Sequence, residues 1–175
     1  MRLFVAISLP EVVKNKLKKV ITLLDKYDGI KTVETKNLHL NLEFLGQRKK
    51  PDKIIRDLKE LSFTPFILET KDFGFFPNKK YIKVIWLGIK NNKDLEKLQE
   101  KVSRLTTNQK KYIPHITLAR IKKINTKQKK QLLKQLKQHK TQPIKFEVKD
   151  FKLYQSKLTS IGPIYNTIQK FPANT

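Results

Sequence analysis

Two stretches of this chain decide its fold: LHLNLEFLG, from Leu38 to Gly46, and PHITLAR, from Pro114 to Arg120. Each begins a short apolar alternation with a histidine and places a small polar residue two positions later, as His39-Leu40-Asn41 and His115-Ile116-Thr117. In a β-strand, residues i and i+2 point to the same face. Each stretch therefore predicts a strand that presents one imidazole and one hydrogen-bonding group side by side. Two such strands facing one groove would provide a layout for general acid–base chemistry on a phosphate.

The remaining patterns predict an α+β fold. Apolar alternation and β-branched residues indicate strands over residues 2–8, 39–45, 66–73, 81–89, 113–121, 145–153 and 158–168. Apolar residues at helical spacing indicate helices that begin near Pro10, Pro51, Asn92 and Thr126. The order is β-α-β-α-β followed by β-α-β-α-β-β, so the chain repeats one organisation. Each half carries one histidine motif on its second strand.

We therefore expect one domain over residues 1–175, built as a bilobal, pseudo-two-fold duplicated fold. The lobes would cover residues 1–78 and 79–175, with the termini able to cross between them. Antiparallel sheets would face a central cleft, and the helices would lie outside. The length of the chain is sufficient for one well-buried core.

Composition restricts the chemistry that this chain can perform. It contains no Cys, which excludes disulfides, thiolate metal sites and a cysteine nucleophile. Two widely separated histidines without HExxH do not form a zinc-ligand pattern, and Gly-rich phosphate loops and GxSxG are also missing. We therefore expect neither a metal nor a cofactor. The sequence lacks a secretory-signal pattern and a long apolar run, so we expect a cytoplasmic protein with no membrane partner.

The charge of the chain is strongly positive. The formal net charge is +24 and the sequence pI is near 10.2. Such a field attracts phosphate-rich partners. The cations are 34 Lys and 5 Arg, however, and Arg is the residue suited to bidentate phosphate contacts. The charge fits a nucleic-acid partner, and compositional drift in the source genome explains it equally well.

Five further residues have both a structural and a functional interpretation. His139 lies in a Lys-rich helix and is predicted to be solvated. Phe4, Tyr165 and Trp86 are candidates for stacking on nucleic-acid bases, with core packing as the alternative. Arg120 follows the second histidine by five positions, so an ideal strand would turn it away from the cleft. Only a bend in the strand would bring it to the cleft, where it would contact phosphate.

Together, these residues resemble the two-histidine phosphoesterase superfamily, and within it the RNA 2′,3′-cyclic phosphodiesterase family, formerly named 2′-5′ RNA ligases. The resemblance runs nearly end to end, through RLFVAI, LHLNLEFLG, GFFPN, YIKVIW, PHITLAR and SKLTSIGPIY. It implies metal-independent hydrolysis of a terminal RNA 2′,3′-cyclic phosphate to a 2′-phosphate, with 2′-5′ ligation of RNA ends as the reverse reaction. The partner of this monomeric enzyme would be RNA with such an end, including tRNA fragments.

The resemblance also implies roles for the motif residues. His39 would be the proton donor and His115 the proton acceptor, while the residues alone leave the two roles interchangeable. Asn41, Thr117 and Arg120 would bind the phosphate. The family's first motif has Thr or Ser where this chain has Asn41, whose amide also donates but reaches further. Two alternatives remain: a non-catalytic or weakly catalytic RNA-binding protein of the same fold, and a phosphodiesterase acting on a small cyclic nucleotide.

Overall fold

The computed structural model describes residues 1–105, 111–139, 142–160 and 162–174. Its elements in chain order are β1 (Arg2–Ser8), α1 (Glu11–Asp25), β2 (Ile30–Thr32), the 3-10 helix η1 (Thr35–Asn37), β3 (His39–Gln47), α2 (Asp52–Lys59), β4 (Phe66–Pro77), β5 (Ile82–Ile89), α3 (Lys93–Ser103), β6 (His115–Ile121), α4 (Thr126–Gln138), β7 (Lys145–Val148), β8 (Asp150–Leu158) and β9 (Pro163–Pro172). The predicted α+β class is confirmed. The strand predicted over residues 145–153 is interrupted at Lys149, and β2 has no counterpart among the sequence patterns.

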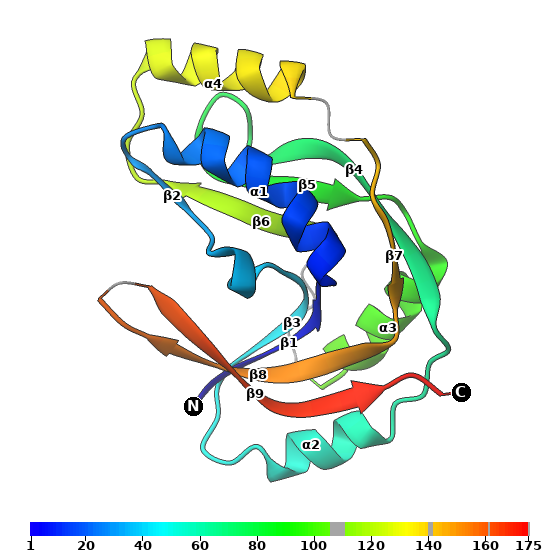
Figure 1. Cartoon of the computed structure of the whole chain (residues 1–175). Coiled ribbons are helices and arrows are strands. Elements are labelled where there is room, and N and C mark those ends of the chain that lie inside the picture. The colour runs from blue at the N-terminus through cyan, green and yellow to red at the C-terminus, as the bar shows by residue number, and fades with distance from the viewer. Residues whose placement is uncertain (106–110, 140–141, 161, 175) are drawn as a thin grey trace.

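The described strands form one antiparallel sheet in the order β7-β4-β5-β6-β3-β1-β8-β9, with β2 beside β6 (Figure 1). We refer to β3, β1, β8 and β9 as the His39 half, and to β6, β5, β4, β7 and β2 as the His115 half. The two halves meet where Leu40 of β3 pairs with Ile116 of β6. This division does not follow residues 1–78 and 79–175. Strand β4 forms a hairpin with its neighbour β5 across the expected boundary, and the C-terminal strands β8 and β9 join β1 from the far end of the chain.

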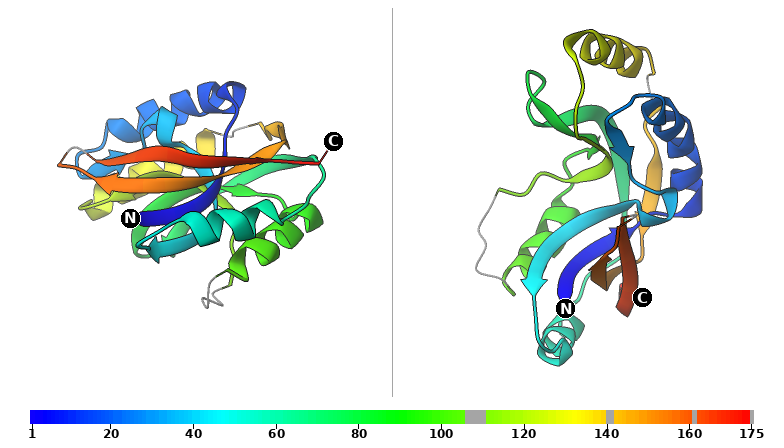
Figure 2. Two further views of the ribbon diagram at one scale, coloured as in Figure 1. Left: turned by 90° about the horizontal axis from the view of Figure 1, so that it is seen from below. Right: turned by 90° about the vertical axis from the view of Figure 1, so that its left-hand side faces the viewer.

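Each half of the sheet is covered by a helix that the other half supplies. Helix α1 follows β1 of the His39 half and packs on β2 and β6, whereas α3 follows β5 of the His115 half and packs on β3. Figures 1 and 2 show α1 and α4 at one end of the molecule and α2 and α3 at the other. The buried stripe of α1 has the predicted helical spacing and consists of Val13, Leu17, Val20, Ile21 and Leu24. This exchange of helices links the two halves, because separating them would expose apolar side chains whose burial stabilises the fold by roughly 1.5–3 kcal/mol each.

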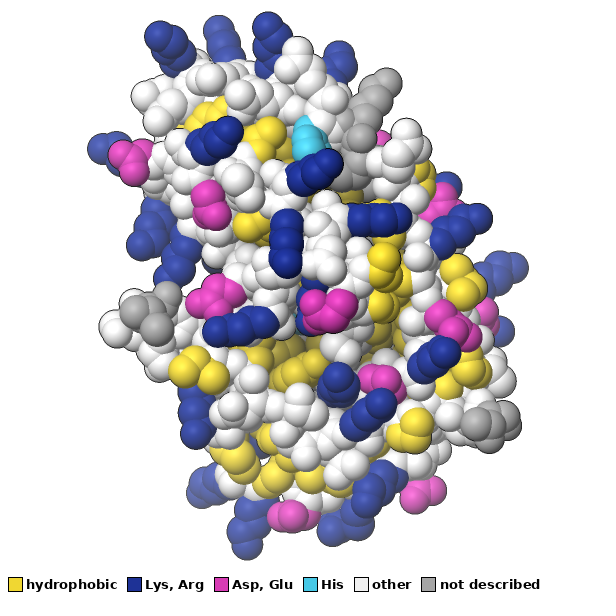
Figure 3. Space-filling view, viewed as in Figure 1, with side chains coloured by type: hydrophobic (Ala, Val, Ile, Leu, Met, Phe, Trp, Pro, Cys, Tyr) yellow, Lys and Arg dark blue, Asp and Glu magenta, His cyan; other side chains and the backbone are white. Residues whose placement is uncertain are grey.

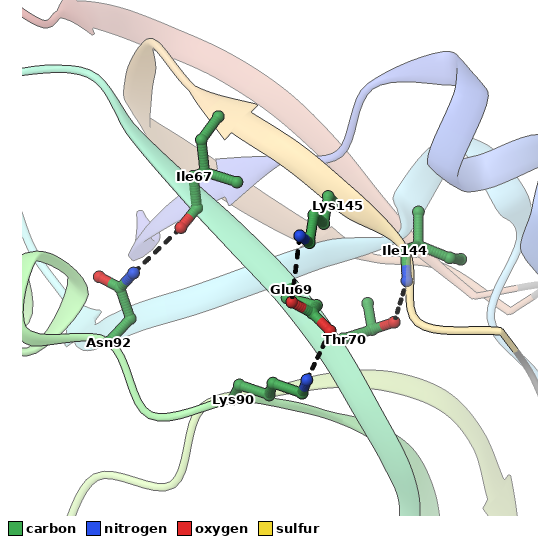
Figure 4. A network of polar contacts seen from close by, with 7 residues as sticks. All are labelled: Ile67, Glu69, Thr70, Lys90, Asn92, Ile144 and Lys145. Atoms are coloured by element: carbon green, nitrogen blue, oxygen red, sulfur yellow. Dashed lines mark hydrogen bonds and ion pairs between the residues drawn. The ribbon is translucent and has the colours of Figure 1, made fainter.

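A polar network attaches the outer strands to α3 (Figure 4). Thr70 of β4 is fully buried, and its Oγ1 accepts a hydrogen bond from the Ile144 backbone N at 2.9 Å. The Asn92 side chain caps α3 by accepting from two backbone N–H groups and donates to the Ile67 carbonyl at 3.0 Å. Buried polar groups need such partners. The network therefore fixes the start of α3, the helix that covers the His39 half, to a strand of the His115 half.

Candidate active site

The two histidine strands have the same local structure. In both β3 and β6 the histidine is half-buried, the next residue is buried, and the polar residue after it is half-buried. The next two residues are both buried, and the fifth residue after the histidine is exposed. Two adjacent buried residues break the alternation of an ideal strand. The cause is a β-bulge, which the register shifts place at Leu42 in β3 and at Leu118 in β6.

The contact between the two strands brings the motifs together. Leu40 and Ile116 pair across the β3–β6 junction, and both side chains are fully buried on one face. Side chains alternate along strands, so those on either side of this pair share the opposite face. Continuing the antiparallel register by one residue places His39 opposite Thr117 and Asn41 opposite His115. We refer to this surface of β3 and β6 as the histidine face.

Both imidazoles are held in the same way. Nδ1 of His39 bonds the backbone O of Asn37 at 2.7 Å, and Nδ1 of His115 bonds the backbone O of Ile113 at the same distance. A carbonyl oxygen only accepts, so each Nδ1 carries the hydrogen and donates it. In the neutral form, Nε2 of each ring is then the free base. The two rings therefore have equivalent tautomers, and either Nε2 can accept or, once protonated, donate a proton.

The surroundings favour the neutral form of both histidines in the free protein. Burial lowers the pKa of His39 from its usual range, the bond to the Asn37 carbonyl opposes this shift, and the charge of His115 adds to it. Burial also lowers the pKa of His115, with the Ile113 carbonyl opposing and the charge of Arg120 adding to the shift. A proton on His115 thus disfavours a second proton on His39. An anionic phosphate between the two rings would reverse this by favouring the charged imidazolium.

Aromatic rings hold the two imidazoles on both halves of the sheet. The His39 ring lies 5.1 Å from Phe4 and 5.4 Å, edge on, from Tyr165. The His115 ring lies 4.9 Å from Phe76 and 5.7 Å from Trp86. These contacts restrict ring rotation, so the aromatic walls preorganise the two nitrogen atoms for one substrate position.

The burial of Phe4 contradicts the expectation that this ring stacks on a nucleobase. Phe4 is only 3% exposed, because Tyr154 stacks on it at 5.1 Å and Tyr165 contacts it edge on at 4.9 Å. A buried ring has no free surface for a nucleobase, so Phe4 supports the wall and does not stack on a base. Tyr165 and Trp86 are partly exposed and keep some free surface.

A glycine shapes the other wall. A Cβ on Gly74 would lie 2.1 Å from two atoms of the Trp86 indole, which is closer than any real contact. Gly74 pairs directly with Trp86 across the β4–β5 ladder. The indole therefore lies flat over the β4 backbone, and this position brings it against His115.

The bulges determine the direction of the side chains beyond each motif. Because the bulge at Leu118 reverses the alternation, Arg120 lies on the histidine face, and its charge acts on both His115 and Tyr165. The bulge thus provides the bend in the strand that Arg120 needs to reach the cleft. The matching residue after the first motif is Phe44, whose side chain is 60% exposed. Phe44 was not among the predicted site residues, although aligning HLNLEF with HITLAR shows that Phe44 and Arg120 hold the same position in the two motifs.

Position 41 has an unusual environment. The Asn41 Oδ1 atom is buried and has no hydrogen-bond partner among the described residues. The amide's only hydrogen-bond donor is its other terminal atom, Nδ2. The backbone O of Asn41 accepts a bond from the Tyr112 hydroxyl at 3.0 Å. Tyr112, another residue that the sequence patterns did not identify, therefore links the segment before β6 directly to β3.

A cavity of about 720 Å³ lies away from these residues. It is bounded by β4 and α4, and its lining includes Phe73, Phe75, Leu136 and His139. Phe75 and Phe76 are neighbours on one strand and point to opposite faces. Since Phe76 contacts His115, the cavity is on the other side of the sheet. The structure thus separates His139 from the histidine pair.

Lys and Arg side chains are not confined to one part of the visible surface. Figure 3 shows these side chains around the whole outline and across the visible face, with acidic side chains among them. No described helix is both long and apolar enough to cross a membrane. Within the described ranges, no group of three or more His, Asp or Glu side chains has a metal-binding arrangement.

The fold and the paired histidines define the class of this protein, a two-histidine phosphoesterase. Residues 12–159 match the 2′-5′ RNA ligase superfamily, and the chain belongs to this family. It is 39% identical to the RNA 2′,3′-cyclic phosphodiesterase of Methanocaldococcus jannaschii, over 98% of this chain and 100% of that protein. It is 34% identical to the protein of the same name from Archaeoglobus fulgidus, over 98% of this chain and 99% of that protein.

Solved structures share the fold. The crystal structure of TT0787 of Thermus thermophilus matches with a TM-score of 0.78 and 28% identity, over 98% of this chain and 97% of that one. Escherichia coli LigT complexed with phosphate matches with a TM-score of 0.78 and 22% identity, over 99% and 98% of the two chains. At that identity LigT supports the fold alone.

Proposed function

We propose that this protein hydrolyses the 2′,3′-cyclic phosphate at the end of an RNA to a 2′-phosphate, using His39 and His115 as acid and base. The observation that carries the proposal is the Leu40–Ile116 pair, which places both histidine motifs on one face with equivalent tautomers. The relatives named RNA 2′,3′-cyclic phosphodiesterase, similar over nearly their full length, support the same substrate.

The reaction needs two proton transfers and one attack. Nε2 of His115 accepts a proton from water, whose oxygen forms a bond to phosphorus. The bond from phosphorus to the 3′-oxygen breaks, and protonated Nε2 of His39 donates its proton to that oxygen. The products are a 2′-phosphate and a 3′-hydroxyl. The assignment of acid and base rests on the family resemblance, because the two rings have the same hydrogen-bonding pattern.

Three groups stabilise the phosphate in this proposal. The Asn41 amide and the Thr117 hydroxyl lie beside the two histidines and donate to its non-bridging oxygens. Arg120 adds a positive charge from the same face. Such preorganised donors act on the charge that develops in the transition state. The bound phosphate also raises the pKa of His39, which supplies the protonated acid that burial disfavours in the free protein.

The partner in this proposal is RNA, and tRNA fragments are one source of such ends. The enzyme acts as a cytoplasmic monomer and needs no metal. The same two histidines in the same roles would catalyse 2′-5′ ligation: a 5′-hydroxyl replaces water, its oxygen bonds to phosphorus as His115 accepts its proton, and the bond from phosphorus to the 3′-oxygen breaks as His39 donates a proton to that oxygen.

The decisive experiment is incubation with an RNA that ends in a 2′,3′-cyclic phosphate, in the presence of EDTA, followed by identification of the product. A 2′-phosphate is expected. Salt-dependent RNA binding without turnover would indicate an RNA-binding protein instead. Equal rates on a nucleoside 2′,3′-cyclic phosphate and on longer RNAs would indicate a small cyclic nucleotide as the substrate.

A further inference from the structure

The two carbonyls that hold the imidazoles are themselves fixed in different ways. His39 donates to the backbone O of Asn37, and His115 donates to that of the residue at the same position in its own motif, Ile113. Ile113 is followed by Pro114, and a residue before proline is restricted to extended conformations. Asn37 has no proline after it. The backbone of Asn37 therefore lacks a restraint that the backbone of Ile113 has.

The side chain of Asn37 supplies a restraint of another kind. Its Nδ2 donates to the backbone O of Pro163 at 3.2 Å, a bond between residues 126 positions apart. Asn37 is the last residue of η1, and Pro163 is the first residue of β9. Asn37 thus joins the His39 imidazole, through its carbonyl, to the β8–β9 hairpin, through its amide. Ile113 has an aliphatic side chain, which cannot form such a bond.

The start of β9 is a fixed point for this bond. The turn before it is closed by Thr159, whose backbone N and Oγ1 both donate to the Gly162 carbonyl, at 3.0 Å and 2.6 Å. Two residues into β9, the Tyr165 ring contacts the His39 ring edge on, at 5.4 Å. The beginning of β9 therefore supports the same imidazole twice, once by a ring contact and once through the carbonyl that accepts from Nδ1.

We propose that Asn37 is a positioning residue for His39, because its side chain fixes the carbonyl that keeps one proton on Nδ1 and directs Nε2 toward the substrate. The hydrogen bond at one ring nitrogen sets the state of the other. Without the bond to β9, the carbonyl can rotate away, and His39 can turn or adopt the Nε2–H tautomer. This inference rests on the proposed function, in which His39 is the acid.

The other groups around His39 are not altered by a change at Asn37. The titratable neighbours are His115 on β6 and Tyr165 on β9, and the charge of Arg120 acts on both of them. Strand β1 contributes a Phe ring. The bond to the Asn37 carbonyl raises the pKa of His39 against the larger effect of burial. Weakening this bond should therefore lower the pKa of His39 and leave the pKa of His115 nearly unchanged.

The first test follows both imidazoles by proton–nitrogen correlation NMR, which reports the tautomer and the titration of each ring without turnover. Asn37→Leu is close in size to wild type and removes the donor. In this variant His39 should lose part of its Nδ1–H tautomer and titrate at lower pH, while His115 keeps its tautomer and titration. Asn125→Leu is the matched control, because it removes a side-chain bond to the backbone N of Gln128 at the start of α4 and should lower stability alone.

Kinetics on a cyclic-phosphate RNA give a second readout. Asn37→Leu should lower kcat by about 2- to 12-fold, the equivalent of one hydrogen bond, and change KM by less than about twofold. The alkaline limb of the pH–kcat profile reports the loss of the proton from the acid, so it should move to lower pH. Asn37→Ala removes the same bond with a smaller side chain and should behave in the same way.

Three outcomes would overturn the inference. His39 could keep its wild-type tautomer and titration in both Asn37 variants, both imidazoles could change together, or neither variant could fold, which would show that Asn37 holds the fold as a whole. The NMR test separates this inference from the proposed function. The expected changes at His39 without any hydrolysis by wild type would refute only the proposed function, and hydrolysis by wild type without those changes would refute only the role of Asn37.

Discussion

Replacing Asn41 with Leu should make the protein more stable and less active at the same time. The Asn41 Oδ1 atom is buried without a partner among the described residues, and an unsatisfied buried carbonyl costs about 1–3 kcal/mol. Leu is similar in size and removes that cost. The free energy of unfolding should therefore rise by about 1–3 kcal/mol, and the melting temperature by about 2–4 °C for each kcal/mol in a chain of this length. The bond from Tyr112 goes to the backbone and survives the substitution.

The same substitution removes the Nδ2 donor from the histidine face. If this donor acts as an oxyanion-type contact, its loss costs about 2–4 kcal/mol of transition-state stabilisation, or about 30- to 900-fold in kcat/KM. Asn41→Thr restores a shorter donor and should keep or raise the activity.

Steady-state kinetics on one cyclic-phosphate RNA and thermal unfolding of the same samples measure both effects. Asn166→Leu, an exposed change on β9, is the control and should affect neither strongly. A Leu variant with wild-type kcat/KM would show that position 41 does not touch the phosphate. A Leu variant that is less stable than wild type would show that Oδ1 has a partner in solution.

Four further outcomes are expected. His39→Ala and His115→Ala should each lower kcat by about 10²–10⁴-fold. The fall in kcat of the double variant should be far smaller than the product of the two single effects, because the two histidines act as a unit. His139→Ala should change kcat little, and an equal fall in kcat for this variant would refute the site. Tyr112→Phe should lower kcat by up to about 10-fold with little change in KM, because it breaks a link to β3. Its control, Tyr27→Phe, breaks the bond to α4 and should reduce only stability; a similar kcat for both variants would exclude a positioning role. The free energy of unfolding should fall as the pH drops below about 6.5, because burial lowers the pKa of His39 in the folded protein and the unfolded imidazole binds a proton more readily. Denaturant titrations at several pH values should show a weaker pH dependence of this free energy for His39→Gln. An unchanged pH dependence in this variant would contradict the prediction. Finally, hydrolysis should continue in EDTA, and complete loss that one divalent ion restores would overturn the mechanism.

The sequence by itself determined the four helices, most of the strands and the identity of the histidine motifs, but not β2 or the break at Lys149. Residues two apart on a strand share a face, so the pairing of His39 with Asn41 and of His115 with Thr117 needed no tertiary information. Helix α1 follows equally from local spacing, because its apolar residues recur along one side. The two matching motifs in similar surroundings also carried the family resemblance.

Only the tertiary structure decided what lies around the motifs. A bulge exists only where two residues of one strand oppose one residue of a partner, so no period-2 pattern in β6 alone could place Arg120 on the histidine face. The same holds for Phe44 in β3. The burial of Phe4 depends on Tyr154 and Tyr165, which β8 and β9 bring from the far end of the chain. Strand order and ring packing depend on contacts between residues far apart in the chain, because they are set by which strand edges and apolar surfaces remain to be covered. Local sequence patterns therefore do not predict them.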